Sequence, residues 1–271
     1  MFAWNTPHLS SSQVEQLVAS SFDFRQLGVE KAMDIRRNDS EKISQQEPPP
    51  QRSFQQVWQK IGQTAAFLSQ PLPLWIASVV PSQTHLWKPY TGTRVVRLAE
   101  IPLCQTYATL GIDRALAVWG AWHLYQTSVL VVDAGTALTL TGASSQGTFT
   151  GGAILPGLGL QIQALGQNTA TLPSIPTDFI QSSPPRWGSN THDAIRSGIF
   201  YTTLAGVKDF LQAWWQDFPH SHVVVTGGDG DFLYSRLPAS FPEQATAIHY
   251  LPHLLLQALG WLVELSETWE K

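Results

Sequence analysis

The sequence has little charge, a single cysteine and no long apolar run, and each of these absences excludes a class of protein. Charged residues make up 13% of the 271 residues and hydrophobic residues 43%, which predicts a compact fold whose poorly charged surface suits an oligomer interface. The lone Cys104 excludes an internal disulfide and suits a reducing cytosol, so we expect a cytoplasmic protein. No run is long enough to span a membrane, and the first residues lack the basic and then apolar order of a signal peptide.

Several well-known catalytic and binding motifs are also missing. A net charge of -4, with no basic cluster larger than Arg36-Arg37, argues against a nucleic-acid partner. There is no P-loop, and no Gly-x-Gly-x-x-Gly follows a strand, which counts against a dinucleotide-binding fold. The sequence has neither His-Glu-x-x-His nor a Cys/His cluster, which argues against a zinc site. It also has no Gly-x-Ser-x-Gly, which argues against a serine hydrolase triad.

The most informative feature that is present lies between Val129 and Gly142. A run of apolar residues ends at Asp133, turns through Gly135-Thr136 and resumes as a second apolar run. This pattern predicts a buried strand, a tight turn and a returning strand. An acid at the point where backbone amides and a hydroxyl converge suits a phosphate with its cation. Asp-x-Gly also makes ordinary hairpin turns, so the pattern alone leaves both interpretations open.

Strands and helices alternate along the rest of the chain, which predicts an α/β fold. We expect further strands at 74–80, 95–96, 148–155 and 222–226, and helices at 9–22, 53–68, 112–125, 158–165 and 190–215, the last capped by Asn190 or Thr191. Residues 34–52 are polar and contain three successive prolines, so we expect an extended, mobile loop there.

Two short motifs each allow two interpretations. Gly111-Ile112-Asp113-Arg114 opens the helix before the hairpin, where the helix dipole favours an acid such as Asp113. One interpretation is an acid at the start of a helix beside a surface arginine. The other is an acid that deprotonates a substrate hydroxyl, beside an arginine whose guanidinium binds a carboxylate. The turn from Thr226 to Gly230 is either a tight strand-to-helix turn or a place where a flat ring or phosphate approaches the backbone.

These motifs belong to a longer series that occurs in one order. The series is Leu110-Gly-Ile-Asp-Arg114, Asp133-Ala-Gly-Thr-Ala137, Gly151-Gly-Ala-Ile-Leu-Pro-Gly157, Asn168-Thr-Ala-Thr-Leu-Pro173, Gly188-Ser-Asn-Thr191 followed by Ala194-Ile195 and Gly198, and Thr226-Gly-Gly-Asp-Gly230. Each motif is weak alone, but the ordered set resembles the type III pantothenate kinase family over about residues 70 to 265.

The resemblance implies a fold and a reaction. The fold is that of the actin-like ATPase superfamily: two ribonuclease-H-like α/β domains, expected at 1–125 and 126–271, with ATP in the cleft and two copies forming a homodimer. The implied reaction transfers the γ-phosphoryl group of ATP to the primary hydroxyl of pantothenate, the first step towards coenzyme A. Such phosphoryl transfer needs mainly positioning and charge neutralisation, which the residue types supply.

The resemblance also implies a role for each matching residue. Asp113 matches the catalytic base, and Gly111, Ile112 and Arg114 match the pantothenate-binding loop. Asp133 matches the ligand of an activating monovalent cation, potassium or ammonium, while magnesium accompanies the phosphates. The remaining matches are Gly135 and Thr136 at ATP, Gly227 and Gly228 at the adenosine, and Thr191, which reaches the substrate from the partner subunit.

The chain departs from the family pattern in two places. The family opens with a strand-turn-strand built on Gly-Asn-Thr or Gly-Asn-Ser, which holds the ATP phosphates, and no such element occurs here. Residues 1–8 resemble the tail of the second strand, so we expect the first domain to be truncated at its N-terminus. Either the start codon is placed too late, or the short form has lost half of its phosphate clamp. Tyr107, expected to contact pantothenate, lies closer to Asp113 than the family spacing.

Three functional hypotheses follow. The first is pantothenate kinase activity, yielding 4'-phosphopantothenate. The second is a non-catalytic or accessory relative that binds a partner or ligand without turnover, a hypothesis motivated by the missing phosphate clamp. The third is another small-molecule kinase of the same superfamily, since a fold does not determine its substrate. Arg114 argues against the third, because its guanidinium suits a carboxylated acceptor.

Overall fold

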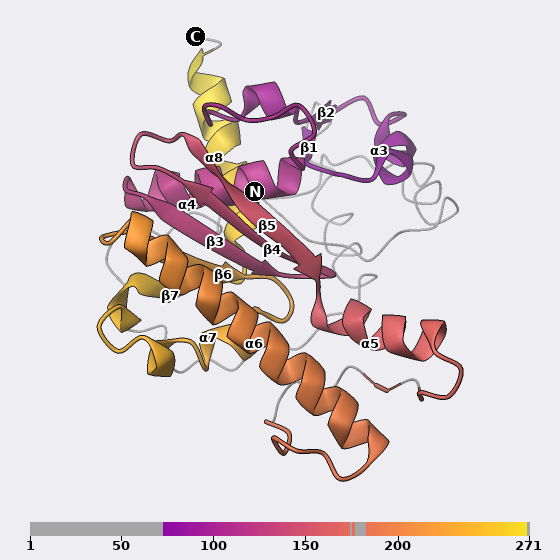
Figure 1. The fold of residues 1–271 in the computed structure, drawn as a ribbon. Helices are drawn as coiled ribbons and strands as arrows, with labels where there is room; N and C mark the ends of the chain where they lie inside the picture. The colour runs from indigo at the N-terminus through magenta and orange to yellow at the C-terminus, as the bar shows by residue number, and fades with distance from the viewer. Residues whose placement is uncertain (1–72, 174, 177–182, 270–271) are drawn as a thin grey trace, which may run out of the picture. The chain divides into compact units, whose positions relative to one another are not determined.

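The computed structural model describes residues 73–173, 175–176 and 183–269, and these residues form mixed α/β structure (Figure 1). The chain divides into two compact units after Val96. The helices expected at 9–22 and 53–68, the loop at 34–52 and residues 1–8 lie outside the described residues. The domain boundary expected between residues 125 and 126 stays a prediction.

The described part of the first unit is a short β-α-β segment. Its elements are β1 (Leu74–Ile76), α3 (Pro81–Trp87) and β2 (Thr93–Val95), and the two strands pair in parallel. The strand expected over 74–80 is shorter, because the hydroxyl of Ser78 accepts a hydrogen bond from the Val80 N–H and turns the chain. Pro81 then begins α3, where its missing N–H costs nothing.

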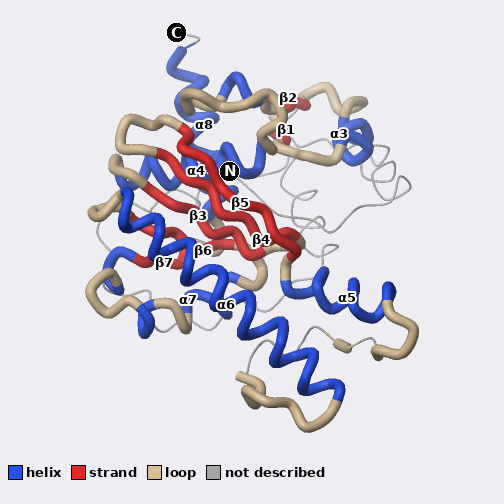
Figure 2. Tube along the Cα trace, viewed as in Figure 1, coloured by secondary structure: helices blue, strands red, loops and turns tan. Residues whose placement is uncertain are grey.

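The second unit is built on one five-stranded sheet (Figure 2). Its elements in chain order are η2 (Leu98–Glu100), α4 (Ile112–Tyr125), β3 (Val129–Ala134), β4 (Ala137–Ala143), β5 (Phe149–Pro156), α5 (Leu158–Asn168), α6 (Thr191–Asp217), β6 (His222–Thr226), α7 (Gly230–Tyr234), η4 (Pro238–Ser240), η5 (Ala245–Ala247), β7 (Ile248–Tyr250) and α8 (Leu254–Trp269). The strand order is β5-β4-β3-β6-β7; β4 runs antiparallel to both of its neighbours, and β3, β6 and β7 are parallel.

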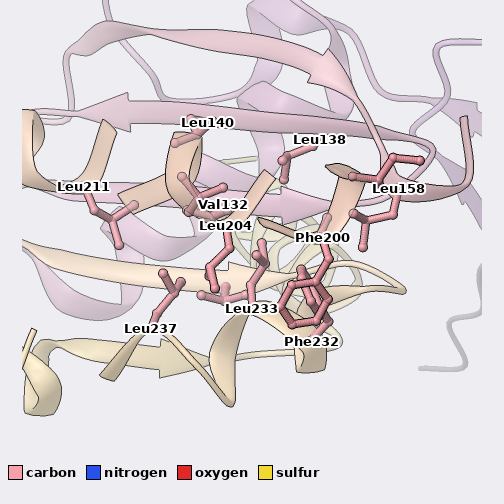
Figure 3. Packing of buried hydrophobic residues seen from close by; sticks show 14 of the residues in the cluster. Val132, Leu138, Leu140, Leu158, Phe200, Leu204, Leu211, Phe232, Leu233 and Leu237 are labelled. Atoms are coloured by element: carbon pink, nitrogen blue, oxygen red, sulfur yellow. The ribbon is translucent and has the colours of Figure 1, made fainter. Parts of the chain in front are cut away.

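Helices pack on both faces of this sheet. Leu130 and Val132 of β3 belong to a core that they share with α5, α6 and α7, and Figure 3 shows this packing around Val132, Phe200 and Leu204. Val131 alternates with Leu130 and Val132, so it faces the opposite side, where α4 packs on β3 and β4. A central strand that is buried on both faces explains why β3 is an almost continuous apolar run.

The pair formed by α4 and α8 depends on small side chains. A Cβ at Gly120 of α4 would collide with the Cβ of Ala258 in α8, so the two helices approach more closely than larger residues allow. Among the described helices, none has the length and apolar character needed to cross a membrane.

Most of the predicted elements in the described ranges are present. The helix predicted at 112–125 has those bounds, and the predicted hairpin, the strands near 148–155 and 222–226 and the long helix near 190–215 all form. In this helix Leu116 and Trp119 are buried, whereas Trp122 lies partly at the surface and donates its indole N–H to the carbonyl of Ser145. β7 was not predicted, because three residues are too few for a periodic pattern.

A pair of histidines joins β6 and β7 at the end of the sheet where β6 begins. His222 Nδ1 and His249 Nε2 are hydrogen-bonded at 2.9 Å, and the Tyr125 ring stacks on both with centroid distances of 4.5 and 4.6 Å. Burial lowers the pKa of His222, and burial together with the charge of His222 lowers the pKa of His249 to about 4. One ring must accept the shared hydrogen bond, so at least one of the two is neutral.

We expect His249 to lower the free energy of unfolding as the pH falls from about 6.5 towards about 4. In this window the unfolded chain binds a proton at this residue that the folded chain does not, so His249 favours unfolding in acid, whereas the raised pKa of Asp133 acts in the opposite sense. His249→Phe leaves a ring for Tyr125 to stack on and removes the histidine contribution, so its free energy of unfolding should fall less, or rise more, with acid than that of wild type, measured by urea unfolding at a series of pH values. His253→Phe makes the same exchange at an exposed position and should keep the wild-type slope. Equal slopes for His249→Phe and wild type would contradict the assignment.

Candidate active site

Four neighbouring strands of the second unit contribute to one row of side chains. In the strand register Ile154 of β5 lies beside Thr139 of β4, Thr139 beside Asp133 of β3, and Asp133 beside Thr226 of β6. Because side chains alternate across a sheet, these four lie on one face. Ile154 is 64% exposed, whereas Thr226 is buried, so the row runs from an open edge into the interior.

Arg114, in the first turn of α4, is buried over the same face of the sheet. Its Nε donates to Thr141 Oγ1 at 3.0 Å, its Nη1 to Tyr107 Oη at 3.0 Å and its Nη2 to the Leu140 carbonyl at 3.4 Å. Within the described ranges no carboxylate forms an ion pair with this guanidinium. All three acceptors are neutral, so no ion pair within the described ranges compensates the buried charge of Arg114.

The space for this guanidinium depends on Gly152. In the register of β4 and β5, Gly152 lies opposite Thr141. A Cβ at Gly152 would collide with the carbonyl oxygen of Leu140 and would lie 2.7 Å from Arg114 Nη2. The second glycine of the Gly151-Gly152 pair is therefore required first by the close approach of the Leu140 carbonyl and then by that of Arg114, rather than by a turn.

Two carboxylates lie close to each other beside Arg114. Asp113 Oδ1 accepts the backbone N–H of Arg114 at 2.8 Å, at the positive end of the α4 dipole. Burial, and then the charge of Asp113, raises the pKa of Asp133 to about 6. Of the described residues, none donates a hydrogen bond to the Asp133 carboxylate. A largely buried carboxylate with a second acid nearby and no donor favours a cation.

The turn after β6 closes against Asp133. Gly227 has a φ of +91°, which favours glycine, and a Cβ there would lie 2.5 Å from Asp133 Oδ1. The N–H of Asp229 donates to the Ala134 carbonyl at 2.9 Å and holds this turn on the end of β3. Gly228 is exposed, with no atom within 4 Å of a built Cβ, so a planar group can approach the backbone at this point.

The hairpin turn between β3 and β4 lies on the other side of Asp133. The Gly157 N–H donates to the Thr136 carbonyl at 2.9 Å, and a Cβ at Gly157 would collide with the Gly135 carbonyl. The side chain of Thr136 is exposed. Glycine turns therefore flank the buried acid on both sides, and their backbone groups can surround a phosphate.

The structure thus gathers most of the predicted site residues in one region of the second unit. Gly111 is the N-cap of α4 and Ile112 begins the helix, so both hold the backbone that carries Asp113 and Arg114. Tyr107, whose spacing departs from the family pattern, nevertheless reaches the Arg114 guanidinium.

Thr191 is the exception. It is exposed as the first residue of α6, after Asn190, whose Oδ1 accepts the Asp193 N–H at 3.0 Å as the predicted cap. Thr191 lines a groove of about 710 Å³ formed by α5 and the N-terminal part of α6, with apolar walls that include Leu165 and Ile195. No residue that surrounds Asp133 lines this groove, and Figure 1 shows this end of α6 extending away from the sheet.

Thr141 and Ile154 were not recognised from the sequence as site residues. Thr139 and Thr141 are two residues apart on an otherwise apolar strand, which places both hydroxyls on one face. That spacing was the available signal for Thr141, but the position of Arg114 over this face comes from the packing of α4. Ile154 gives no such signal, because an exposed apolar residue on a strand cannot be recognised from alternation alone.

Comparisons with known proteins identify one family. Residues 34–213 match the family described as type III pantothenate kinase. A type III pantothenate kinase of Nostoc sp. is 49% identical over 193 residues, which are 71% of this chain and 70% of that protein. One of Synechococcus sp. (strain JA-3-3Ab) is 45% identical over 201 residues, which cover 70% of this chain and 81% of the relative.

A solved structure has a similar fold. It is described as a conserved Baf family transcriptional activator from Campylobacter jejuni and superposes with a TM-score of 0.54. The match covers 73% of this chain and 85% of that one, at 22% sequence identity. At this identity the likeness concerns the fold alone.

We expect Gly152→Ala to lower the free energy of unfolding by about 1–3 kcal/mol, the usual cost of overpacking a filled interior. The added methyl group must displace Arg114 or the Leu140 carbonyl. Gly206→Ala is the matched control, because a Cβ there meets no atom within 4 Å and a helical position of α6 favours alanine. Urea unfolding of both variants is the measurement. A Gly152→Ala variant as stable as Gly206→Ala would show that the crowding around Gly152 is relieved without cost.

Proposed function

Because the chain belongs to the type III pantothenate kinase family, we propose that it transfers the γ-phosphoryl group of ATP to the primary hydroxyl of pantothenate. The product is 4'-phosphopantothenate, and the reaction is the first step towards coenzyme A. The comparisons give no support to the alternative of a non-catalytic relative.

The observation that carries this proposal is the uncompensated charge of Arg114. A buried guanidinium bound only by neutral acceptors attracts an anion, and one N–H remains available on each of Nη1 and Nη2. Two such donors suit the two oxygens of a carboxylate, which pantothenate carries. The same feature argues against an acceptor alcohol without a carboxylate.

In the mechanism that we propose, Asp113 accepts the proton of the pantothenate hydroxyl. Asp113 precedes Arg114 in the first turn of α4, and pantothenate, whose carboxylate and primary hydroxyl are at opposite ends, would extend from the guanidinium to this carboxylate. In a loose transition state the hydroxyl loses its proton late, so an ordinary carboxylate suffices as the base. Asp113 thus orients the hydroxyl and then takes its proton.

Asp133 is the residue that we propose for the monovalent cation, potassium or ammonium. Its donor-free, largely buried carboxylate beside Asp113 fits a cation, which would offset part of the negative charge of the two acids and of the phosphates. Within the described ranges no three acidic, histidine or cysteine side chains gather. We therefore propose that magnesium enters with the phosphates of ATP, whose oxygens supply most of its ligands.

For ATP itself, we propose that the two glycine turns beside Asp133 form the site. Gly135 and Thr136 would contact the phosphates through the backbone and the exposed hydroxyl. Gly227 and Gly228 would lie along the adenosine, which the exposed, uncrowded backbone at Gly228 supports. A Gly228→Val variant with unchanged KM for ATP would contradict this placement.

The second compact unit also supports the proposed fold family. Its mixed five-stranded sheet with helices on both faces is compatible with one ribonuclease-H-like domain of an actin-like ATPase. The expected first domain, 1–125, remains a proposal. For the location, the lone Cys104 supports a cytoplasmic protein, which cell fractionation checks.

We propose that two copies form a homodimer through the region that contains Thr191. The exposed N-terminal part of α6 carries a groove of about 710 Å³, and Trp187, which is 89% exposed, lies four residues before Thr191. A surface that carries both a groove and a protruding apolar side chain can be complementary to itself about a two-fold axis. Such a dimer would bring Thr191 of one copy to the substrate of the other.

We expect the purified chain to phosphorylate pantothenate with ATP and magnesium, and Asp113→Asn to lower kcat at least about 100-fold, as loss of a general base does. Asparagine has the same shape, so pantothenate binding by calorimetry and the melting temperature should stay close to wild type. The assay follows phosphopantothenate directly, with either potassium or sodium present.

Two outcomes of this assay would count against the assigned roles. An Asp113→Asn variant within about tenfold of wild-type turnover would remove Asp113 from the role of base. Equal turnover in potassium and in sodium would contradict the assignment of potassium to the site at Asp133.

A second experiment tests the shared site. Asp113→Asn and Thr191→Ala are co-expressed with different tags, and the heterodimer is isolated by two affinity steps. Each variant alone is expected to be impaired, whereas the heterodimer contains one site with both native residues and should recover about half of wild-type turnover, as two-fold symmetry requires. A heterodimer no more active than its parents would show that Thr191 does not act across the interface.

A further inference from the structure

The Arg114 guanidinium is held by three acceptors that differ in rigidity. Tyr107 is 44% exposed, and the bond to the Leu140 carbonyl is long at 3.4 Å. Thr141, by contrast, is 1% exposed and lies in β4, which is hydrogen-bonded to a neighbouring strand on each side. Its hydroxyl is therefore the best-fixed polar side chain in contact with Arg114.

The bond from Thr141 also determines which edge of the guanidinium remains available. Nε has a single N–H, and Thr141 occupies it at 3.0 Å. A carboxylate cannot then bind side-on to Nε and one Nη, so the donors left for it are one N–H each of Nη1 and Nη2. Because the guanidinium is planar, fixing Nε also fixes the direction in which these two donors point.

We infer that Thr141 is a positioning residue that orients Arg114 for the carboxylate of the substrate. The inference rests on the proposed role of Arg114 in binding pantothenate. Thr141 is buried beneath Arg114 and acts through that side chain. Loss of the Thr141 hydroxyl leaves Arg114 Nε without a hydrogen-bond partner and allows the guanidinium to rotate. The substrate carboxylate then binds more weakly in the ground state, while the proton transfer at Asp113 is unchanged.

The test compares Thr141→Val, which removes the hydroxyl at nearly constant shape, with Thr141→Ser, which keeps it. We expect Thr141→Val to raise KM for pantothenate about tenfold, as expected for a lost hydrogen bond to a charged group. The kcat and the KM for ATP should change less than about twofold, and Thr141→Ser should restore KM to within about threefold of wild type. Ser221→Ala is the control, because it removes another buried hydroxyl that bonds Trp214 and the Phe218 carbonyl.

A double-mutant cycle with Arg114→Ala separates this inference from the proposed function. If Arg114→Ala leaves KM for pantothenate unchanged, the proposed role of Arg114 fails, and the inference fails with it. If Arg114→Ala raises KM and Thr141→Val does not, only the inference is overturned. In the Arg114→Ala background Thr141→Val should add less than about twofold, because residues that act through one another are not additive. An equal effect in both backgrounds would assign Thr141 a structural role. Thr141→Ala replaces Thr141→Val in the cycle if the latter does not fold.

Discussion

The buried guanidinium of Arg114 is the constraint on which the rest of the site depends. A charge with only neutral acceptors around it is costly, so its surroundings allow little change. Gly152 must lack a side chain, and Thr141 and Tyr107 supply the hydroxyls. The sheet can meet these demands because β4 is held by a strand on each side, so the positions around the guanidinium are rigid.

Charges of opposite sign are kept apart in this site instead of neutralising each other. Asp113 and Asp133 lie close enough for one to raise the pKa of the other, yet neither forms an ion pair with the Arg114 guanidinium. Arg114 therefore favours a bound anion, and Asp133 favours a bound cation. A phosphoryl-transfer enzyme with a carboxylated acceptor and a cation meets both, which links the electrostatics of the described fold to the proposed reaction.

Local patterns predicted the elements that carry these residues. The apolar run of β3 ending at Asp133, the helix that begins at Ile112 and the Asn190 cap of α6 all follow from contiguous residues and are present. Each depends on interactions within a few residues, such as helix capping and the burial of a strand on both faces. β7 and the early end of β1 were missed, since one is very short and the other depends on a side-chain hydrogen bond at Ser78.

The sequence by itself determined the family, the order of the motifs and the two acids and one arginine that carry the proposed chemistry, because these are contiguous patterns of residue types. Only the tertiary structure decided that Thr141 and Gly152 surround the Arg114 guanidinium and that Tyr107 reaches it despite its unusual spacing. It also decided that Thr191 lies in a groove away from the residues around Asp133. The reason is that strand register and the packing of α4 on the sheet bring Arg114 into contact with Leu140 and Thr141, which are 26 and 27 positions away along the chain. No local sequence pattern encodes contacts over that separation.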